Sequence, residues 1–167
     1  MIVKTLIIVV GLFLLLFLES FFTTLFSFCV LILVLLILID KWDWKSWSFF
    51  AVISTLITDT LLHRPFGVTL FAVAISLATL YLLFLVMPKK QIILSYIPYF
   101  FAIFLFYLLL NLLTPLLQDG VWGVVNWLDI FGYTIRAIIS VLIIFLSNRV
   151  IENFRSNEDI LVWKILK

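Results

Sequence analysis

Long apolar runs follow one another along the whole chain, separated only by short groups of charged residues, prolines or glycines. A helix that crosses the hydrocarbon core of a bilayer needs about 20 mostly apolar residues. Six segments meet this requirement, at residues 2–18, 21–39, 46–62, 66–87, 92–113 and 130–150. We therefore expect an all-α, polytopic membrane protein. Its six transmembrane helices would form a single bundle over residues 1–150, with a tight turn at Glu19-Ser20.

The composition excludes several other classes of protein. Hydrophobic residues make up 66% of the chain and charged residues only 12%, whereas a soluble domain carries roughly 45–50% apolar and about 25% charged residues. The 11 basic and 9 acidic side chains are too few to cover the surface of a soluble domain. A soluble globular, disordered, disulfide-rich or nucleic-acid-binding protein is excluded for this reason, and the lipid bilayer is the expected environment.

The positions of lysine and arginine predict the orientation, because cytoplasmic loops of membrane proteins carry an excess of basic residues. With the N-terminus in the cytoplasm, nine basic residues lie on the inner side, Arg64 lies outside, and Arg136 falls within the sixth segment. The nine are Lys4, Lys41, Lys45, Lys89, Lys90, Arg149, Arg155, Lys164 and Lys167. Both termini are therefore expected in the cytoplasm.

Two amphipathic stretches lie outside the six segments. Residues 116–129 form an outer loop that contains Trp122 and Trp127 and is too apolar for a solvated linker. This loop either lies along the membrane interface or docks another protein. Residues 151–167 form a cytoplasmic tail that ends in apolar residues with two lysines, Lys164 and Lys167. The tail either adsorbs to the membrane surface or binds a cytoplasmic partner.

Side chains that could perform chemistry are scarce. A metal site needs several converging histidine, cysteine or carboxylate ligands, and the chain has one histidine, His63, and one cysteine, Cys29. No serine or aspartate is placed by a motif to pair with His63 as in a catalytic triad, and the five glycines form no phosphate-binding loop. We expect no catalytic residue, no metal and no cofactor, and hence a protein that is not an enzyme.

The most informative stretch ends the third segment. Residues at seven- and four-residue steps share one side of a helix, and those found here are Ser48, Thr55, Asp59 and His63. An ionisable residue within a span is costly and tends to find a partner inside the bundle. We expect Asp59 to accept hydrogen bonds from His63 or from Arg64.

The turn after Asp59 carries its own signals. Pro65 restrains the backbone, and Gly67 allows a close approach where the fourth segment begins. Two interpretations of Asp59 remain open at this point. It either pins the helical hairpin at the outer interface, or it contributes to the binding of a partner or substrate.

The fourth and sixth segments also carry polar patterns. Small residues line one face of the fourth segment, at Thr69, Ala72, Ser76 and Thr79, and such faces allow close packing of helices in lipid. In the sixth segment Arg136 either pairs with Asp129 or extends outward past it. A structural ion pair is the favoured interpretation over a charge used in transport.

The third-to-fourth-segment turn resembles the rod-shape-determining membrane protein family MreD. That family has a signature of the Gly-Leu-x-x-Asp type followed by a Pro–hydrophobic–Gly turn. The matching residues are Thr55-Leu56-Ile57-Thr58-Asp59 and Pro65-Phe66-Gly67, with Thr55 in place of the glycine. Chain length, the number of spans and the cytoplasmic termini extend the resemblance over the whole chain.

The resemblance implies a multi-pass protein of the bacterial cytoplasmic (inner) membrane that acts without catalysis. It implies a scaffold of the cell-elongation machinery, involved in rod-shape determination and in the regulation of peptidoglycan synthesis. The bitopic protein MreC would be the main partner. The actin-like cytoskeletal protein and a peptidoglycan synthase or transpeptidase would be further partners.

An alternative function follows from the same resemblance. The family is similar in fold to the substrate-binding subunits of energy-coupling-factor vitamin transporters, which are also six-helix bundles of similar size. Such a subunit would need a concave outer pocket lined by polar and aromatic groups. It would also need an alanine-rich face on its first helix to dock the coupling subunit. Residues 2–18 contain no alanine, which argues against this alternative.

Overall fold

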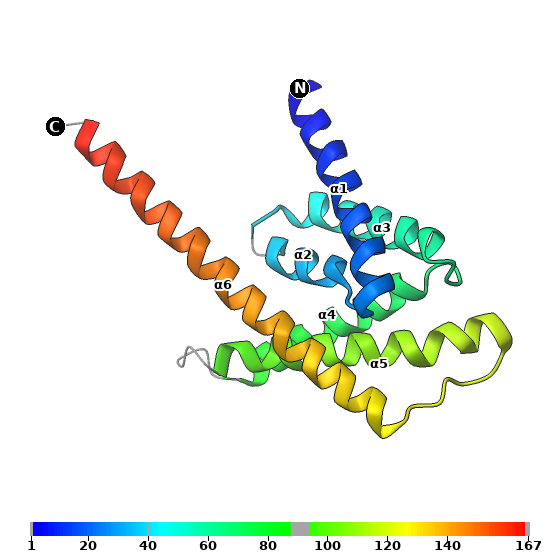
Figure 1. Ribbon diagram of the computed structural model, residues 1–167. Coiled ribbons are helices and arrows are strands. Elements are labelled where there is room, and N and C mark those ends of the chain that lie inside the picture. The colour runs from blue at the N-terminus through cyan, green and yellow to red at the C-terminus, as the bar shows by residue number, and fades with distance from the viewer. Residues whose placement is uncertain (1, 40, 88–93, 166–167) are drawn as a thin grey trace.

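The computed structural model describes the backbone of residues 2–39, 41–87 and 94–165, and the side chains of residues 10–39, 41–87 and 95–151. Within these ranges the chain forms helices and no strand (Figure 1). The helices are α1 (Ile2–Phe26), α2 (Val30–Leu38), α3 (Trp44–Leu61), α4 (Val68–Val86), the short 3₁₀-helix η1 (Leu94–Tyr96), α5 (Ile97–Asp119) and α6 (Trp127–Ile165). The all-α class predicted from the sequence is confirmed.

Among the described helices, three are long and apolar enough to cross a membrane: α4, α5 and the part of α6 from Trp127 to Ile151. The 19 residues of α4 extend roughly 28 Å, close to the ~30 Å thickness of the hydrocarbon core. Large apolar side chains are exposed on these helices, for example Phe71, Val86 and Phe131. Such a surface suits lipid rather than water and indicates a membrane protein.

The first two predicted spans, 2–18 and 21–39, are wrong as separate helices. α1 continues through Glu19-Ser20, and the chain turns after Phe26 instead. α2 has only nine residues, roughly 14 Å of helix, which is less than half of the hydrocarbon core. The reason lies in Glu19, whose carboxylate is buried and accepts hydrogen bonds inside the protein. The chain therefore does not have to turn there to expose the charge to water.

The third and fourth predicted segments, 46–62 and 66–87, correspond closely to α3 and α4. The fifth is shifted, because Pro115 lies inside α5 rather than at its end. Proline has no N–H to donate to the carbonyl of Asn111 four residues earlier. Gly123, in the connection after α5, packs on that carbonyl so closely that a Cβ atom at position 123 would lie 2.2 Å from its oxygen. The connection thus covers the carbonyl that the proline leaves free.

α6 is longer at both ends than the predicted segment 130–150. Its start is set by Asn126 and Asp129: the Asn126 N–H donates to the Asp129 carboxylate (3.0 Å), and the Asp129 N–H donates to the Asn126 carbonyl (3.1 Å). The bond from the Asn126 N–H to the Asp129 carboxylate is one half of a capping box, whereas the return bond goes to the backbone carbonyl of Asn126 rather than to its side chain. At the other end the backbone stays helical to Ile165 and projects beyond the other helices (Figure 1). The predicted tail therefore continues α6, and its side chains beyond Ile151 lie outside the described residues.

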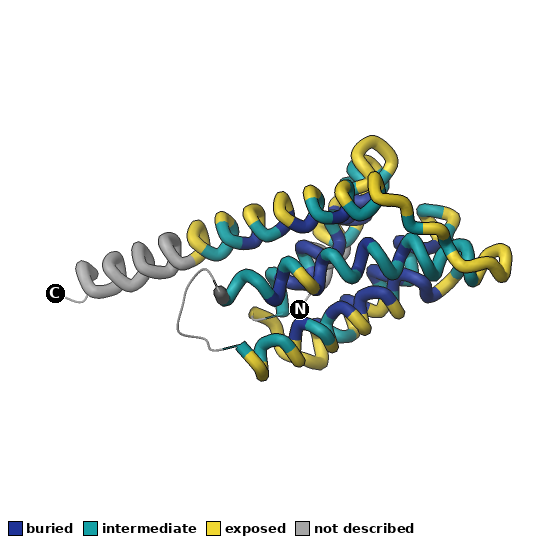
Figure 2. Tube along the Cα trace, turned by 90° about the horizontal axis from the view of Figure 1, so that it is seen from below, coloured by how far each residue is buried: buried dark blue, intermediate teal, exposed yellow. Residues whose placement is uncertain are grey.

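The core lies between α2, α4, α5 and α6. Buried residues gather along the facing sides of these helices, and exposed residues point outward (Figure 2). The largest fully buried side chains include Leu31 and Leu35 of α2, Ile103 and Phe106 of α5, and Ile144 of α6. α3 is tied to α2 by the Trp47 indole N–H, which donates to the Leu35 carbonyl (2.9 Å).

The small-residue face predicted for the fourth segment is confirmed in its first part. Thr69, Ala72 and Ser76 are buried, and Thr79 is half-buried. α4 makes its most extensive interface with α5, where Ala102 is also buried. Small side chains on both helices allow their backbones to approach closely, which is the usual way in which helices associate in lipid.

The connections between helices gather at two ends of the bundle. The α3–α4 turn and the α5–α6 connection lie at one end, on the right in Figure 1, and the α2–α3 connection lies toward the other. The residues expected between the fourth and fifth spans, including Lys89 and Lys90, lie outside the described residues. The candidate site described next is at the end with the α3–α4 turn.

Candidate functional site at the α3–α4 end of the bundle

Asp59 lies in the last turn of α3, two residues before its end, and its side chain is fully buried. Its carboxylate accepts hydrogen bonds from the N–H of Gly67 (2.9 Å) and the N–H of Thr69 (3.2 Å), and it also accepts one from the Thr69 hydroxyl. These groups begin α4, where backbone N–H groups have no partner within the helix. Asp59 therefore caps α4, and its negative charge lies at the positive end of the helix dipole.

The turn between α3 and α4 has a backbone that suits this cap. Gly67 has a φ of +90°, in the left-handed region that a side chain disfavours. The Arg64 N–H donates to the Asp59 carbonyl (2.9 Å), and the Val68 N–H donates to the Pro65 carbonyl (3.2 Å). Two backbone hydrogen bonds, one at the end of α3 and one at the start of α4, thus stabilise the turn. The prediction that Asp59 occupies a buried position near Pro65 and Gly67 is confirmed.

The predicted side-chain partners of Asp59 are wrong. His63 is exposed and adopts a φ of +51°, because α3 ends at Leu61 and the four-residue helical spacing from Asp59 is lost there. Arg64 donates to Asp59 only from its backbone. On the expected face of α3, Thr55 and Asp59 are buried but His63 is not. The carboxylate is satisfied by the start of α4 instead of by cations.

Glu19 is a second buried carboxylate, which the sequence interpretation placed in a turn. Its oxygens accept hydrogen bonds from the Leu31 N–H (2.7 Å), the Cys29 thiol (2.8 Å) and the Thr23 hydroxyl (3.2 Å). Leu31 lies in the first turn of α2, so Glu19 caps α2 as Asp59 caps α4. The signal that could have revealed this role is an acidic residue inside an otherwise apolar run.

A polar cavity of about 340 Å³ lies beside these two caps. Its walls come from the end of α1, the α1–α2 and α3–α4 connections, α5 and α6. The polar and aromatic residues that line it are Thr23, Ser27, Arg64, Tyr107, Asn111, Thr114, Tyr133 and Arg136. This volume falls within the range of small-molecule sites, roughly 300–1,000 Å³.

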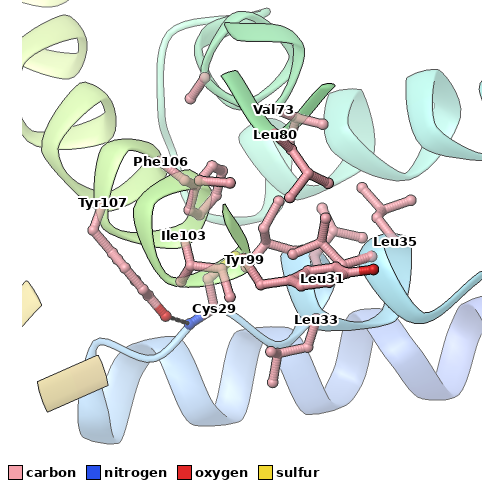
Figure 3. Close-up of a cluster of buried hydrophobic side chains, with 14 of the residues drawn as sticks. Cys29, Leu31, Leu33, Leu35, Val73, Leu80, Tyr99, Ile103, Phe106 and Tyr107 are labelled. Carbon is pink, nitrogen blue, oxygen red and sulfur yellow. Dashed lines mark hydrogen bonds between the residues drawn. The ribbon is translucent and has the colours of Figure 1, made fainter. Parts of the chain in front are cut away.

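The tyrosines of the cavity are fixed in place by their neighbours. The Cys29 N–H donates to the Tyr107 hydroxyl (2.9 Å), which joins α5 to the start of α2 (Figure 3). The Tyr107 and Tyr133 rings stack with an interplanar angle of 6° and centroids 6.3 Å apart. The Tyr133 hydroxyl interacts with the side chain of Asn111. One wall of the cavity is therefore built from two stacked, anchored rings.

Both arginines predicted as site residues line this cavity. Arg136 does not pair with Asp129, so that expectation is wrong. The Arg136 guanidinium lies 5.6 Å from the Tyr107 ring centroid and 6.0 Å from that of Tyr133. The Asp129 carboxylate instead accepts the Asn126 N–H at the start of α6. Within the described part of the chain Nη1 of Arg64 is buried without a hydrogen-bond partner.

Trp122 and Trp127, the two other predicted site residues, lie outside this cavity. Both are exposed, to 63% and 86%, in or next to the connection that crosses α5. Their positions leave them free to contact the membrane interface or another protein, the two alternatives that the sequence allowed.

The fold and the site define an all-helical protein with candidate membrane spans, two buried capping carboxylates and a polar cavity at one end. Comparison with protein-family models, with curated proteins and with solved structures found no match. The described residues contain no group of three or more histidine, cysteine or acidic side chains suited to hold a metal ion.

Proposed function

We propose that the chain is a non-catalytic membrane scaffold of the bacterial cell-elongation machinery. In this proposal it is a multi-pass protein of the cytoplasmic membrane that acts in rod-shape determination and in the regulation of peptidoglycan synthesis by binding a bitopic protein of the MreC type. The actin-like cytoskeletal protein and a peptidoglycan synthase or transpeptidase are the further proposed partners.

The observation that carries this proposal is the Asp59 cap. Asp59 and Gly67, two residues of the stretch that resembles the MreD signature, are joined in the structure as well as similar in sequence. They contact each other through a buried hydrogen bond of 2.9 Å, and Gly67 has the φ of +90° that favours glycine. The pattern on which the resemblance rests is therefore one structural unit, and its spacing has a physical reason.

The surroundings of the cap support a scaffold. The buried Asp59 carboxylate fixes the turn, while large side chains near it are exposed. One of them is Phe66, which is 74% exposed. Trp122 and Trp127 add exposed aromatic surface in the connection at the same end. Aromatic residues on a fixed backbone are typical of protein contacts, because they bury a large area at a small cost in conformational entropy.

Co-purification tests this proposal. The tagged full chain, expressed in its own bacterium and extracted in mild detergent, is expected to bring down a single-span protein of the MreC type, identified by mass spectrometry. The Phe66→Ala variant is expected to recover less of that partner, whereas Phe71→Ala, at an exposed position farther along α4, serves as the matched control. Recovery of no single-span partner would contradict the proposal.

The alternative is a substrate-binding subunit of a vitamin-type transporter, and one observation favours it: the polar, aromatic cavity of about 340 Å³. The same co-purification separates the two functions. A transporter subunit would bring down a pair of ATPases together with a membrane coupling subunit, and no protein of the MreC type.

A further inference from the structure

Two guanidinium groups line one cavity, and neither forms an ion pair with a carboxylate of the described residues. Arg64 comes from the α3–α4 turn and Arg136 from α6. Nη1 of Arg64 is buried and makes no hydrogen bond within the described residues. The Arg136 guanidinium lies over the rings of Tyr107 and Tyr133, at 5.6 and 6.0 Å from their centroids, and it also lines the cavity. Arginine is the residue best suited to bind phosphate, because its planar fork of donors matches the oxygens.

The two buried carboxylates beside the cavity already have hydrogen-bond partners of their own. Glu19 lies next to two residues of the cavity wall, Thr23 and Cys29, but its oxygens already accept hydrogen bonds from both of them and from the N–H of Leu31. The Asp59 carboxylate, in the turn that carries Arg64, is likewise occupied by the N–H groups of Gly67 and Thr69 and by the Thr69 hydroxyl. Neither carboxylate is therefore free to bind an arginine side chain. A partly buried, unpaired charge in a bundle of this kind is costly, so the cavity is suited to an anion.

Arg136 also lines a second hollow, and this one is apolar. The groove has a volume of about 520 Å³ and runs between α1 and α6. Phe22 and Phe26 form its α1 side, and Ile139 and Ile143 continue it along α6. From Arg136 to Ile143 the helix rises roughly 10 Å. A polar cavity and an apolar groove therefore meet at a single arginine.

We propose that this pair of hollows binds an anionic phospholipid, whose phosphate head group carries a net negative charge. The phosphate lies between Arg64 and Arg136 in the polar cavity, and a hydrocarbon chain lies in the groove between α1 and α6. The positive charge of the cavity and the apolar lining of the groove select this amphipathic anion over a neutral lipid. The site is independent of the proposed protein partner and goes beyond a scaffold function.

Lipid titration of the full chain in neutral detergent micelles, followed by native mass spectrometry, tests the proposal. Phosphatidylglycerol is expected to bind saturably, with one high-affinity molecule per chain. The affinity for phosphatidylcholine with the same acyl chains should be at least about tenfold lower, because its head group carries no net negative charge. Equal binding of the two lipids would overturn the proposal.

Charge variants locate the head group. Arg64→Gln and Arg136→Gln are each expected to weaken phosphatidylglycerol binding about tenfold, since each removes charge-assisted hydrogen bonds to phosphate. Arg149→Gln is the matched control, because Arg149 is an exposed arginine on α6 away from the cavity. Where a glutamine variant does not fold, the corresponding lysine variant retains the charge and should keep part of the affinity. Unchanged binding in both cavity variants would overturn the assignment.

A variant of the groove distinguishes a lipid ligand from a free anion. Ile139→Trp fills the groove and is expected to weaken phosphatidylglycerol binding about tenfold without changing the effect of inorganic phosphate on the melting temperature. Leu142→Trp, exposed on α6 and outside the groove, is the matched control. If inorganic phosphate stabilises the protein as strongly as phosphatidylglycerol, or if Ile139→Trp binds the lipid normally, the ligand is a free anion and the lipid proposal is wrong.

Discussion

At the scale of single residues, the molecule depends on two carboxylates that are shielded from water. A buried carboxylate is stable only when its oxygens accept strong hydrogen bonds. Asp59 and Glu19 meet this need in the same way, since each accepts the N–H of the second residue of the following helix, Thr69 in α4 and Leu31 in α2. The same contacts satisfy helix ends that would otherwise lack partners in an apolar environment.

Asp59→Ala is expected to lower the free energy of unfolding by about 1–3 kcal/mol, because the buried N–H groups of Gly67 and Thr69 lose their acceptor. The melting temperature of the purified chain in detergent, followed by circular dichroism, measures the effect. Asp43→Ala is the control, because Asp43 is exposed and its side chain makes no cap hydrogen bond. Equal melting temperatures for the two variants would show that the cap contributes no stability.

Part of this site could be predicted from local signals. Asp59 stands out as an acid inside an apolar run, and Pro65 and Gly67 mark a turn. The partners of Asp59 could not be predicted in the same way, since they depend on α3 ending at Leu61, which leaves His63 exposed. The link from Cys29 to Tyr107 joins residues 78 positions apart, and no local pattern encodes such a contact.

At the scale of elements, packing explains where prediction from periodicity fails. Pro115 does not end α5: the helix continues to Asp119, and the following connection packs on it, with the Gly123 N–H donating to the Leu112 carbonyl (3.5 Å). Glu19 does not end α1, because the start of α2 satisfies its charge. In both cases a residue that usually interrupts a helix is accommodated by a neighbouring segment. Where no such segment intervenes, as in α3 and α4, the predicted boundaries are nearly correct.

Gly123→Ala is expected to displace the α5–α6 connection, because the added Cβ atom would lie 2.2 Å from the Asn111 carbonyl oxygen. Backbone atoms cannot yield to such a contact without a shift of the whole connection. Limited chymotrypsin digestion measures the result, as cleavage after the exposed Trp122 should become faster. Gly11→Ala, where the added atom meets nothing within 4 Å, should digest like the parent chain. Identical rates for the two variants would contradict the packing described for Gly123.

At the scale of the whole molecule, charge is segregated along the bundle. Lys41 and Lys45 are exposed near the α2–α3 connection, and Arg149 is exposed toward the projecting end of α6. Arg64 and Arg136 are at the other end, where they line the cavity. The orientation expected from the positive-inside rule, with the termini in the cytoplasm, would place the end that carries the cavity on the outside of the cell.

Reporter fusions test this orientation. Alkaline phosphatase inserted in the connection at residues 120–126 should be active, since the enzyme folds only outside the cytoplasm. A green fluorescent protein fused after Lys167 should fluoresce, since it folds in the cytoplasm. The candidate spans α4, α5 and α6 require these two sites to lie on opposite sides of the membrane. An active phosphatase at the C-terminus would contradict the orientation.

The two carboxylate caps also bear on the order in which the chain assembles. Asp59 reaches Gly67 over only 8 residues, and Glu19 reaches Leu31 over 12. Contacts this close in sequence close short loops and form early. Each hairpin can therefore provide hydrogen bonds to its own carboxylate while the ribosome is still synthesising α5. The Tyr107 hydroxyl then joins helices that have already lost their exposed charges, so that no unpaired acid has to enter the membrane late in biogenesis.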